Sequence, residues 1–478
     1  MFFHINTDSE KPIYIQIFDA IKEMIETNML PAHSKLPSTR EMGRLLGVSR
    51  STVITAFECL ESSGFIYTLN GKGTFVSPKK IKLNNEWNID WKEKFNQYAY
   101  DTEDLDLMKN GMPYKKGMIS FKSIAPDENL FDIDEIKRSF MDLMGVEGNK
   151  ILNYGYAKGY RPLINFIMEY MKKIGAALEN KSVIITNGFT EGFDLVLDSL
   201  TSAGDKVLCE NPTHNTAIKQ MRLHGLDIHG VNMDENGMDV SALESELLKC
   251  QFKLAYLIPS YHNPTGISIS YDRRKELYDV FKQHNVPIVE DGFSEELQHH
   301  SSHIAPMVAV SGKENSVIYI GSFSKILFPG MRIGWIFGDE VLIDMLQSVK
   351  RAKNIHTSFL DQGILYHYMQ SGSYEKYIKK IRNIYGDKCQ YTIKLIKKYL
   401  PWEYISGEGG LYVFIKLKNI DSHKLLENCY KRGVLFMPGD VFYVENPAKN
   451  ALRLSFSRNS YEELEKGIKI IGEECMKF

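Results

Sequence analysis

The sequence predicts an α/β protein with a small N-terminal domain and a much larger C-terminal one. Residues 11–77 carry three helical patterns followed by two short β-like runs. From about Ile119 onward, β-rich runs alternate with amphipathic helical stretches, which is typical of a domain with a mostly parallel sheet. Residues 78–118 are polar and lack a sustained apolar period, so we expect a linker there, with one short helix around Trp91–Tyr98.

Composition and charge exclude several classes of protein. Of the 478 residues, 43% are hydrophobic and 25% are charged, which rules out disordered, collagen-like and coiled-coil chains. The net charge of −2 means that any nucleic-acid binding must come from a local patch. The six cysteines form no CxxC pair, so we expect neither a disulfide framework nor a structural metal. We find no signal peptide and no apolar run of ~18 residues, and therefore expect a cytoplasmic protein that does not enter the membrane.

The N-terminal domain contains three helices with recognisable ends. Apolar residues recur at helical spacing over residues 13–25. Ser38 and Glu41 have the Ser-x-x-Glu spacing of a capping box at the start of a second helix. Ser49 can cap a third helix, which stops at Gly64.

A hairpin and a group of polar and cationic residues point to DNA. The runs FIYTL and GTFV surround Asn70–Gly73, and Asn-Gly between such runs is a strong hairpin signal. The first turn of a recognition helix faces base edges, where arginine can bond guanine and Ser or Thr can bond phosphates. Residues suited to these contacts are Ser49, Arg50, Ser51 and Thr52 on the third helix and Lys72 at the hairpin tip. The alternative is a small helical domain with scattered surface cations.

The stretch LPSTREMGRLLGVSRSTVITAFECLESSGFIYTLNGKGTFV resembles the GntR-type winged helix-turn-helix. The resemblance covers residues 11–77 without a gap and implies that residues 1–77 form a domain that binds double-stranded DNA. The residues that it places on DNA are Arg40, Arg50, Thr52 and, in the wing, Gly73.

In the C-terminal region, reactive residues directly follow β-rich runs. Lys325 comes after SVIYIGS, beside small hydroxyl residues, where its amine can form a Schiff base with an aldehyde cofactor. Ser322 and Arg332 are suitable phosphate ligands close by in the sequence. The backbone N–H groups of Asn187–Thr190, which leave the run VIIT and open a helix, can cradle a phosphate.

Three more residues complete a candidate site for a cofactor and a substrate. Asp291 ends the run VPIVED, and a carboxylate there can keep a pyridine nitrogen protonated. Asn263, in the turn HNPTG, can donate to a phenolic oxygen, and Arg453 in ALRLSF can bind a substrate carboxylate. Each motif alone has a simpler interpretation: a surface lysine at Lys325, an ordinary turn at HNPTG, a helix cap at Asp291.

Together and in this order, the motifs resemble a fold-type I aminotransferase of the aspartate aminotransferase superfamily, from about Ile119 to the C-terminus. The resemblance implies the cofactor pyridoxal 5′-phosphate (PLP), a large domain with a parallel-rich sheet, and a small α+β subdomain from about residue 375. It implies that Lys325 carries the internal aldimine, that Asp291 pairs with the pyridinium and that Asn263 contacts the ring hydroxyl. The residues that it assigns to the phosphate are Ser322, Arg332 and, through their backbone, Phe189 and Thr190.

The same resemblance assigns a subunit contact and shows two departures. Tyr154, in NYGYAKGYRPL, matches the tyrosine that reaches the partner subunit's phosphate, which implies a homodimer, and Arg453 matches the arginine that grips the α-carboxylate. His214 stands where an aromatic ring usually stacks on the cofactor. Phe293 stands where a tyrosine usually donates to the phenolic oxygen. We therefore expect cofactor binding to survive and catalysis to be weakened.

A winged helix joined by a linker to an aminotransferase-like domain is the arrangement of MocR/GabR-type regulators, which form head-to-tail, domain-swapped homodimers. The first hypothesis is a transcriptional regulator that senses an amino-group effector, or PLP itself, through the aldimine at Lys325. Arg453 would bind the effector's carboxylate, and Arg458 is either a second carboxylate contact or a surface arginine. The second hypothesis is a class I/II aminotransferase that acts on an amino acid and a 2-oxo acid and carries an accessory DNA-binding domain.

Overall fold

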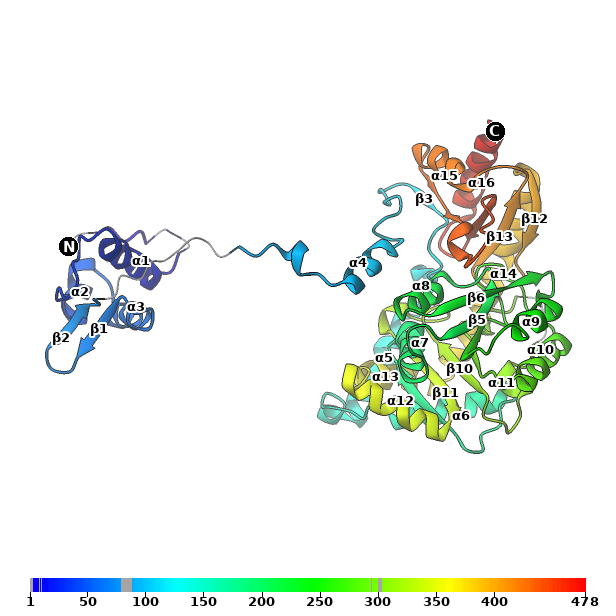
Figure 1. Cartoon of the computed structure of the whole chain (residues 1–478), viewed down its shortest axis with the longest axis horizontal. Helices are drawn as coiled ribbons and strands as arrows, with labels where there is room; N and C mark the ends of the chain where they lie inside the picture. The colour runs from blue at the N-terminus through cyan, green and yellow to red at the C-terminus, as the bar shows by residue number, and fades with distance from the viewer. Residues whose placement is uncertain (1–2, 8, 10, 79–87, 294, 300–302) are drawn as a thin grey trace. The chain divides into compact units, whose positions relative to one another are not determined.

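The chain forms two compact units, each with its own hydrophobic core (Figure 1). The computed structural model describes residues 3–7, 9, 11–78, 88–293, 295–299 and 303–478. The units are Met1–Phe95 and Asn96–Phe478. In the described part of the chain, no helix is both long enough and apolar enough to cross a bilayer.

The N-terminal unit is a three-helix domain with a β-hairpin. Its elements are α1 (Ile13–Glu26), α2 (Thr39–Leu46), α3 (Arg50–Ser62), β1 (Ile66–Leu69) and β2 (Gly73–Val76). Ser38 and Ser49 cap α2 and α3 as predicted, because their hydroxyls accept hydrogen bonds from the backbone N–H groups of Glu41 and Thr52. β1 and β2 pair antiparallel around the predicted Asn-Gly turn. Apolar faces of all three helices meet the hairpin in one small core.

An eight-stranded mixed sheet organises the large unit, in the strand order β4-β11-β10-β9-β8-β5-β6-β7. The strands from β10 through β6 in this order are parallel, whereas β11 and β7 run antiparallel to their neighbours. The bounds are β4 (Lys181–Thr186), β5 (Lys206–Asn211), β6 (Asp227–Asp234), β7 (Gly237–Met238), β8 (Leu254–Leu257), β9 (Ile288–Asp291), β10 (Val317–Ser322) and β11 (Gly334–Asp339). The predicted runs VIIT, VPIVED and SVIYIGS coincide with β4, β9 and β10 of this sheet, so the α/β expectation is confirmed.

Helices pack on the sheet in separate groups (Figure 1). α7 (Gly188–Leu200) and α12 (Glu340–Lys353) contact each other and β11. α10 (Tyr271–Gln283) contacts both α9 (Val240–Leu247) and α11 (Met307–Val310). The other helices of this part are α5 (Ile133–Val146), α6 (Arg161–Lys173), α8 (Asn215–Leu223) and α13 (Phe359–Gln370).

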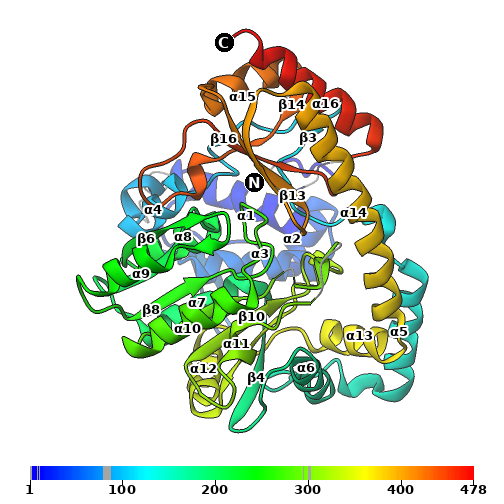
Figure 2. The same ribbon diagram turned by 90° about the vertical axis from the view of Figure 1, so that its right-hand side faces the viewer.

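A smaller α+β part follows the long helix α14 (Ser373–Tyr399), which runs from α13 to α16 (Figure 2). Its four-stranded antiparallel sheet has the order β12-β13-β16-β15. Its elements are β12 (Trp402–Ser406), β13 (Tyr412–Leu417), α15 (Ser422–Lys431), β15 (Met437–Pro438), β16 (Ala451–Ser455) and α16 (Tyr461–Cys475). Beside this sheet, β3 (Ile119–Ser120) pairs with β14 (Val434–Leu435).

The segment predicted as a linker, residues 78–118, is partly folded. Residues 79–87 lie outside the described residues. In place of the single helix predicted around Trp91–Tyr98, the structure has a 3-10 turn, η1 (Trp91–Lys94), followed by α4 (Gln97–Asp104). The expected helix is therefore present but begins later and extends further than predicted.

α4 belongs to the large unit rather than to a linker. The side chain of Asn96 caps α4 by accepting a hydrogen bond from the backbone N–H of Ala99 (3.0 Å). Lys219 on α8 donates to the carbonyl of Thr102 (3.2 Å), and the two helices are in contact. The linker therefore ends near Phe95. The sequence pattern missed this attachment because bonds between a lysine and a backbone carbonyl leave no apolar period.

Because the two units have separate cores, a cavity in one should leave the other unaffected. Leu60 on α3 is fully buried. We expect Leu60→Ala to lower the free energy of unfolding of the N-terminal unit by about 2–5 kcal/mol, and to leave the calorimetric transition of the large unit in place. The control Leu45→Ala removes a side chain that is 50% exposed, and should cost less than about 0.5 kcal/mol. An equal shift of both transitions would show that the units unfold together.

Candidate functional site

The predicted cofactor residues lie where parallel strands end. β9 ends at Asp291, and β10 ends at Ser322. The turn after β10 carries Lys325, and the segment after β8 carries Asn263. The carboxyl ends of parallel strands meet at one edge of a sheet, which is where open α/β sheets bind ligands. The fold thus brings together residues that are far apart in the sequence.

Lys325 lies among charged residues of the predicted site. Burial, together with the nearby guanidinium groups of Arg453 and Arg332, lowers the pKa of Lys325 to about 8, although Asp291 opposes the shift. A larger fraction of this amine is therefore neutral near physiological pH than for an ordinary lysine. The neutral amine is the form that attacks a carbonyl.

Asp291 is 1% exposed and accepts two hydrogen bonds. The hydroxyl of Tyr256 donates to Oδ2 (2.7 Å), and the backbone N–H of Phe293 donates to Oδ1 (3.2 Å). Burial raises the pKa of Asp291 to about 7 in spite of both donors. A cation held against this carboxylate would restore its charge, as a pyridinium nitrogen requires. Sequence reasoning missed Tyr256, although a tyrosine in a fully buried strand needs a partner for its hydroxyl.

His214 and Phe293, the two departures from the aminotransferase pattern, have nearly parallel rings. Their ring centroids are 6.2 Å apart, and their planes differ by 16°. Nδ1 of His214 is 4.0 Å from Oδ2 of Asp291 and has no hydrogen-bond partner among the described residues. Burial lowers the pKa of His214 to about 3, with help from the charges of Lys325 and Arg453. The imidazole is therefore neutral near physiological pH and can stack on an aromatic cofactor.

Arg453 on β16 is a buried guanidinium with no carboxylate partner in the described part of the chain. Its guanidinium carbon is 5.2 Å from the ring centroid of Tyr412 and 4.8 Å from that of Phe442. Nη1 donates to Oδ1 of Asn263 (2.7 Å), Nη2 donates to the carbonyl of Lys122 (3.3 Å), and Nε has no partner. Burial lowers the pKa of Arg453 to about 10. A buried cation is costly unless an anion joins it, which suits the predicted carboxylate contact.

The bond from Arg453 also fixes the orientation of the Asn263 amide. A guanidinium can only donate, so the amide oxygen of Asn263 must face it. The amide nitrogen is left buried and without a hydrogen-bond partner in the described structure. This donor complements an oxygen atom on a ligand, as predicted for the ring hydroxyl.

The N-terminus of α7 has the features of a phosphate cradle. The helix begins at Gly188, whose φ is 79°, and Asn187 provides no side-chain cap. The first N–H groups of α7, which include those of Phe189 and Thr190, therefore face no capping side chain. Arg332 donates to the carbonyl of Asn187 (3.1 Å). A Cβ atom on Gly188 would lie 2.8 Å from Nη2 of Arg332 and would displace the guanidinium, and the positive φ of this residue itself favours glycine.

Two serine hydroxyls connect Arg332 to the end of β10. The hydroxyl of Ser322 accepts from the backbone N–H of Ser324 (3.2 Å), and the hydroxyl of Ser324 accepts from Nη1 of Arg332 (3.2 Å). A helix N-terminus, a guanidinium and hydroxyl groups together match the needs of a phosphate. Sequence reasoning assigned Ser322 but not Ser324, although the spacing Ser-x-Ser before Lys325 was visible.

Two predicted residues make no contact with this group. Tyr154 is 82% exposed, and its ring packs edge-on against His356 with centroids 6.1 Å apart. Arg458 forms an ion pair with Glu128, on the surface of the large unit. Within one chain, Tyr154 is therefore available to another molecule, whereas the charge of Arg458 is already neutralised.

The cations predicted to contact DNA are exposed on the N-terminal unit. Arg40 lies in the first turn of α2, Arg50 begins α3, and Lys72 lies in the hairpin turn. None of the three forms an ion pair with a described residue. Gly73 has a φ of 112°, and a Cβ atom there would lie 2.8 Å from Cε of Lys35. The side chain of Lys35 therefore lies close to Gly73, next to the tip of the hairpin.

The hydroxyls at the start of α3 form one small network. Ser49 accepts from the backbone N–H of Thr52 (3.2 Å), and its hydroxyl also bonds those of Ser51 (2.8 Å) and Thr52 (2.7 Å). This network fixes the first turn of α3 beside the exposed Arg50. A fixed first turn suits a helix that presents its N-terminal residues to base edges.

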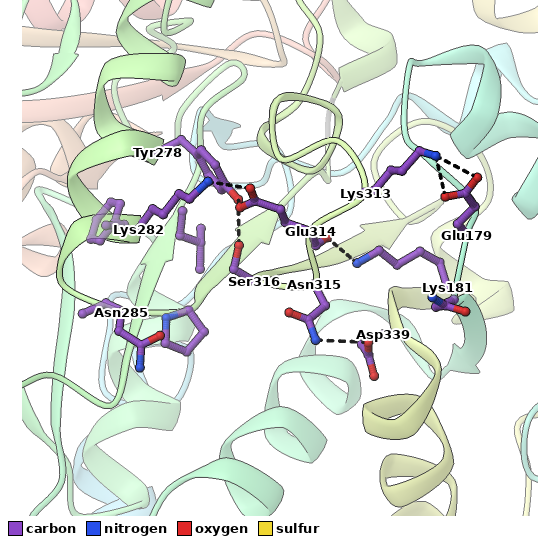
Figure 3. A pocket seen from close by; sticks show the side chains of 15 residues that line it. Glu179, Lys181, Tyr278, Lys282, Asn285, Lys313, Glu314, Asn315, Ser316 and Asp339 are labelled. Carbon is purple, nitrogen blue, oxygen red and sulfur yellow. Dashed lines mark hydrogen bonds and ion pairs between the residues drawn. The ribbon is translucent and has the colours of Figure 1, made fainter.

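A second hollow, of about 630 Å³, lies at the opposite edge of the large sheet, where β9 and β10 begin (Figure 3). Four of its charged side chains form ion pairs with one another, and the other two, Lys181 and Asp339, form hydrogen bonds with the carbonyl of Glu314 and the side chain of Asn315. Lys313 lies 2.8 Å from Glu179, and Lys282 lies 2.5 Å from Glu314. No buried polar atom among its described lining residues lacks a partner. This hollow therefore offers a ligand fewer unpartnered polar groups than the candidate site at the opposite edge of the sheet does.

Two families match the chain. The family "Aminotransferase class I and II" matches residues 118–471, and the family "Bacterial regulatory proteins, gntR family" matches residues 13–76. Solved structures agree with the first match. The multiple substrate aminotransferase from Thermococcus profundus has a TM-score of 0.76 and 27% identity, and the match covers 81% of this chain and 99% of that one.

Curated relatives share either the whole arrangement or its C-terminal part. The uncharacterized HTH-type transcriptional regulator YdfD of Bacillus subtilis is 30% identical over 476 residues, or 96% of each chain. The HTH-type transcriptional regulator NorG of Staphylococcus aureus is 26% identical over 91% of this chain and 98% of its own. The 2-aminoadipate transaminase of Thermus thermophilus is 28% identical over 80% of this chain and 97% of its own. The chain therefore belongs to the aminotransferase class I and II family and carries a GntR-family helix-turn-helix domain at its N-terminus, the arrangement of MocR-type transcriptional regulators.

Proposed function

We propose that the protein is a cytoplasmic, PLP-dependent transcriptional regulator that binds double-stranded DNA and senses an amino-group effector, or PLP itself, at Lys325. The observation that carries this proposal is the presence in one chain of two features. One is the exposed set of cations on the GntR-type unit. The other is a buried site whose polar atoms include three without partners among the described residues, His214 Nδ1, Asn263 Nδ2 and Arg453 Nε.

The residues of this site fit PLP. Lys325 offers an amine to the aldehyde, Asp291 offers a carboxylate to the ring nitrogen, and Asn263 offers an N–H to the ring hydroxyl. Arg332, Ser322 and the N-terminus of α7 offer donors to the phosphate. When bound, PLP supplies an electrophilic aldehyde and an electron-withdrawing ring. The chain supplies the pocket, the charges and the orientation.

An effector that carries a carboxylate would bind at Arg453. This residue lies on β16 of the smaller sheet, whereas Asn263 follows β8 of the larger sheet, and their hydrogen bond joins the two. A carboxylate would compete with Asn263 for the guanidinium. It would thereby favour a different position of the smaller sheet relative to the larger sheet. A ligand shifts such an equilibrium by its differential affinity for the two states. That shift would be the signal to the DNA-binding unit.

We also propose a head-to-tail homodimer. The large side chains near Tyr154 are mostly exposed, and they include Met141, Val146, Leu152 and Tyr156. Exposed apolar side chains that gather in one segment are typical of an interface. In such a dimer, Tyr154 would reach the phosphate cradle of the partner subunit.

A second candidate function is an aminotransferase that acts on an amino acid and a 2-oxo acid. The near-complete set of cofactor residues and Arg453 favour it. Phe293 cannot donate a hydrogen bond to the phenolic oxygen, which weakens this candidate, and proton transfer at Cα would fall to Lys325. Steady conversion of bound PLP to its pyridoxamine form by an amino acid, and back by a 2-oxo acid, would support the enzyme. A ligand that shifts the PLP absorbance and then stalls would support the regulator.

The role of Lys325 can be tested by spectroscopy. Lys325→Ala should abolish the visible absorbance band that bound PLP gives the wild type, because the amine that holds the aldehyde is gone. The control Lys313→Ala, at a lysine that is 75% exposed, should keep the band. In gel-shift assays, Lys325→Ala should still bind promoter DNA but should no longer respond to amino acids. A variant that kept this response would exclude Lys325 as the sensor.

The role of Arg50 can be tested by DNA binding. Arg50→Ala should weaken binding to the protein's own promoter region by about 1–3 kcal/mol if it contacts a base, and should reduce the preference over random duplex. If it contacts only phosphate, binding should weaken equally on both duplexes, and the salt dependence should fall by about one unit of slope. The control is Lys11→Ala, since Lys11 is paired with Asp19. Unchanged binding would remove Arg50 from the interface.

Asp291 predicts a pH dependence of stability for the cofactor-free protein. Folding raises its pKa from 3.8 to about 7, so the folded state binds more protons between these values and loses stability as the pH rises through them. Cofactor-free Asp291→Asn should therefore be more stable than the wild type at pH 8, by roughly 2–4 kcal/mol, and by less at pH 5. With PLP bound, the wild type should instead be more stable than Asp291→Asn. Urea denaturation at both pH values measures the difference, and a pH-independent difference would contradict it.

A further inference from the structure

A cavity of about 560 Å³ in the large unit is rich in methionine, and Lys122 is among the residues that line it. Its apolar lining consists of Met108, Met112, Pro113, Met118, Leu435 and Met437. Met437 pairs with Arg453 across β15 and β16, and it also lines the hollow that contains Thr190 and Arg332 of the phosphate cradle. Two residues of the cavity lining, Met437 and Lys122, are thus direct neighbours of Arg453, the first across the strand pair and the second through its carbonyl. Methionine side chains are flexible and adapt to the shape of an apolar ligand.

Three of the five charged residues that line this cavity form ion pairs with described residues. Arg458 pairs with Glu128, and Asp127 lies 3.6 Å from Lys388. Glu463 accepts a hydrogen bond from the backbone N–H of Ser460 (2.9 Å) in the capping box of α16, and it has no cation within ion-pair distance in the described structure. Lys122 is the remaining charged residue of the lining.

Lys122 has only a weak partner for its ammonium group. Its Nζ donates to the carbonyl of Leu107 at 3.5 Å, and no described carboxylate lies within ion-pair distance of it. Burial lowers the pKa of Lys122, as expected for a cation that nothing neutralises. The carbonyl of the same residue accepts from Arg453 (3.3 Å). One residue thus supports the proposed carboxylate contact with its backbone and places an uncompensated cation in the lining of this cavity.

We propose that the effector is an α-amino acid whose side chain ends in a second anionic group, and that Lys122 binds that group. This inference rests on the proposed regulator function and names its ligand class. The α-carboxylate would bind Arg453, the apolar stem would lie among the methionines, and the terminal anion would give Lys122 the charge-assisted hydrogen bond that it lacks. Lys122 thereby takes the role of second contact that the sequence suggested for Arg458, whose charge Glu128 already neutralises.

The test is a titration of the PLP-loaded, full-length protein, followed by the absorbance of the bound cofactor. The probes are L-2-aminoadipate and L-glutamate, which are anionic, L-norleucine, which is neutral, and L-lysine, which is cationic. We expect the wild type to bind at least one anionic probe about 10-fold to 100-fold more tightly than L-norleucine, the range of a charge-assisted hydrogen bond. In gel-shift assays, that probe should also change DNA binding at the lowest concentration.

Substitutions separate charge recognition from packing. Lys122→Met keeps a long side chain in the methionine-lined cavity, so it should abolish the preference for the anionic probe and leave L-norleucine binding unchanged. Lys122→Glu should invert the preference toward L-lysine. The matched control is Lys116→Met, at an exposed lysine of the same segment, and it should behave as the wild type. Thermal denaturation of each variant shows that it is folded.

Three results would overturn the inference. The first is a wild type with equal affinity for anionic and neutral probes. The second is a Lys122→Met variant that loses all probes equally, which would indicate a structural role. The third is a Lys122→Met variant that keeps its preference but loses its dimeric state on size-exclusion chromatography, which would place Lys122 at a subunit contact. If no probe changes the absorbance of the wild type, the proposed sensing of amino acids is wrong. The spectrum of Lys325→Ala then still shows whether PLP binds at Lys325.

Discussion

The hydrogen bond between Arg453 and Asn263 is the contact on which the candidate site depends. It joins β16 of the smaller sheet to the segment after β8 of the larger sheet, across 190 residues of sequence. It helps to hold a guanidinium in a buried place beside two aromatic rings, where a lone cation is costly. It also turns the amide nitrogen of Asn263 away from the guanidinium. One contact thus creates both a place for an anion and a donor for a ligand oxygen.

The same contact is linked to the segment that leads toward the DNA-binding unit. Lys122 accepts from Arg453 through its carbonyl and donates to the carbonyl of Leu107 through its ammonium. Leu107 follows α4, which packs on α8 of the large unit. In the proposed regulator, a ligand that took over the bonds of Arg453 and Lys122 would therefore change the contacts of this segment directly. A shared set of bonds that ligand and segment both need is a physical route for coupling two sites.

Local patterns in the sequence sufficed for much of the fold and for the position of several candidate residues at the ends of strands. The cap at Ser49, the Asn-Gly hairpin and the β-rich runs depend on short-range rules, and Asp291 could be placed because the ends of parallel strands converge. Contacts between distant segments could not be predicted. The hydroxyl of Tyr256 reaches Asp291 from the next strand, and Arg458 meets Glu128 across 330 residues, because such pairings follow from packing rather than from periodicity.

The two departures from the aminotransferase pattern act together in the structure. Phe293 donates its backbone N–H to Asp291 and lies nearly parallel to the ring of His214, so it supports the site by packing and by its main chain. Burial keeps His214 neutral. Neither residue therefore adds a proton donor beside Lys325. In the proposed regulator, Lys325 would therefore be the residue of this group that moves a proton at the ligand, and a ligand that stayed bound would shift the population of states.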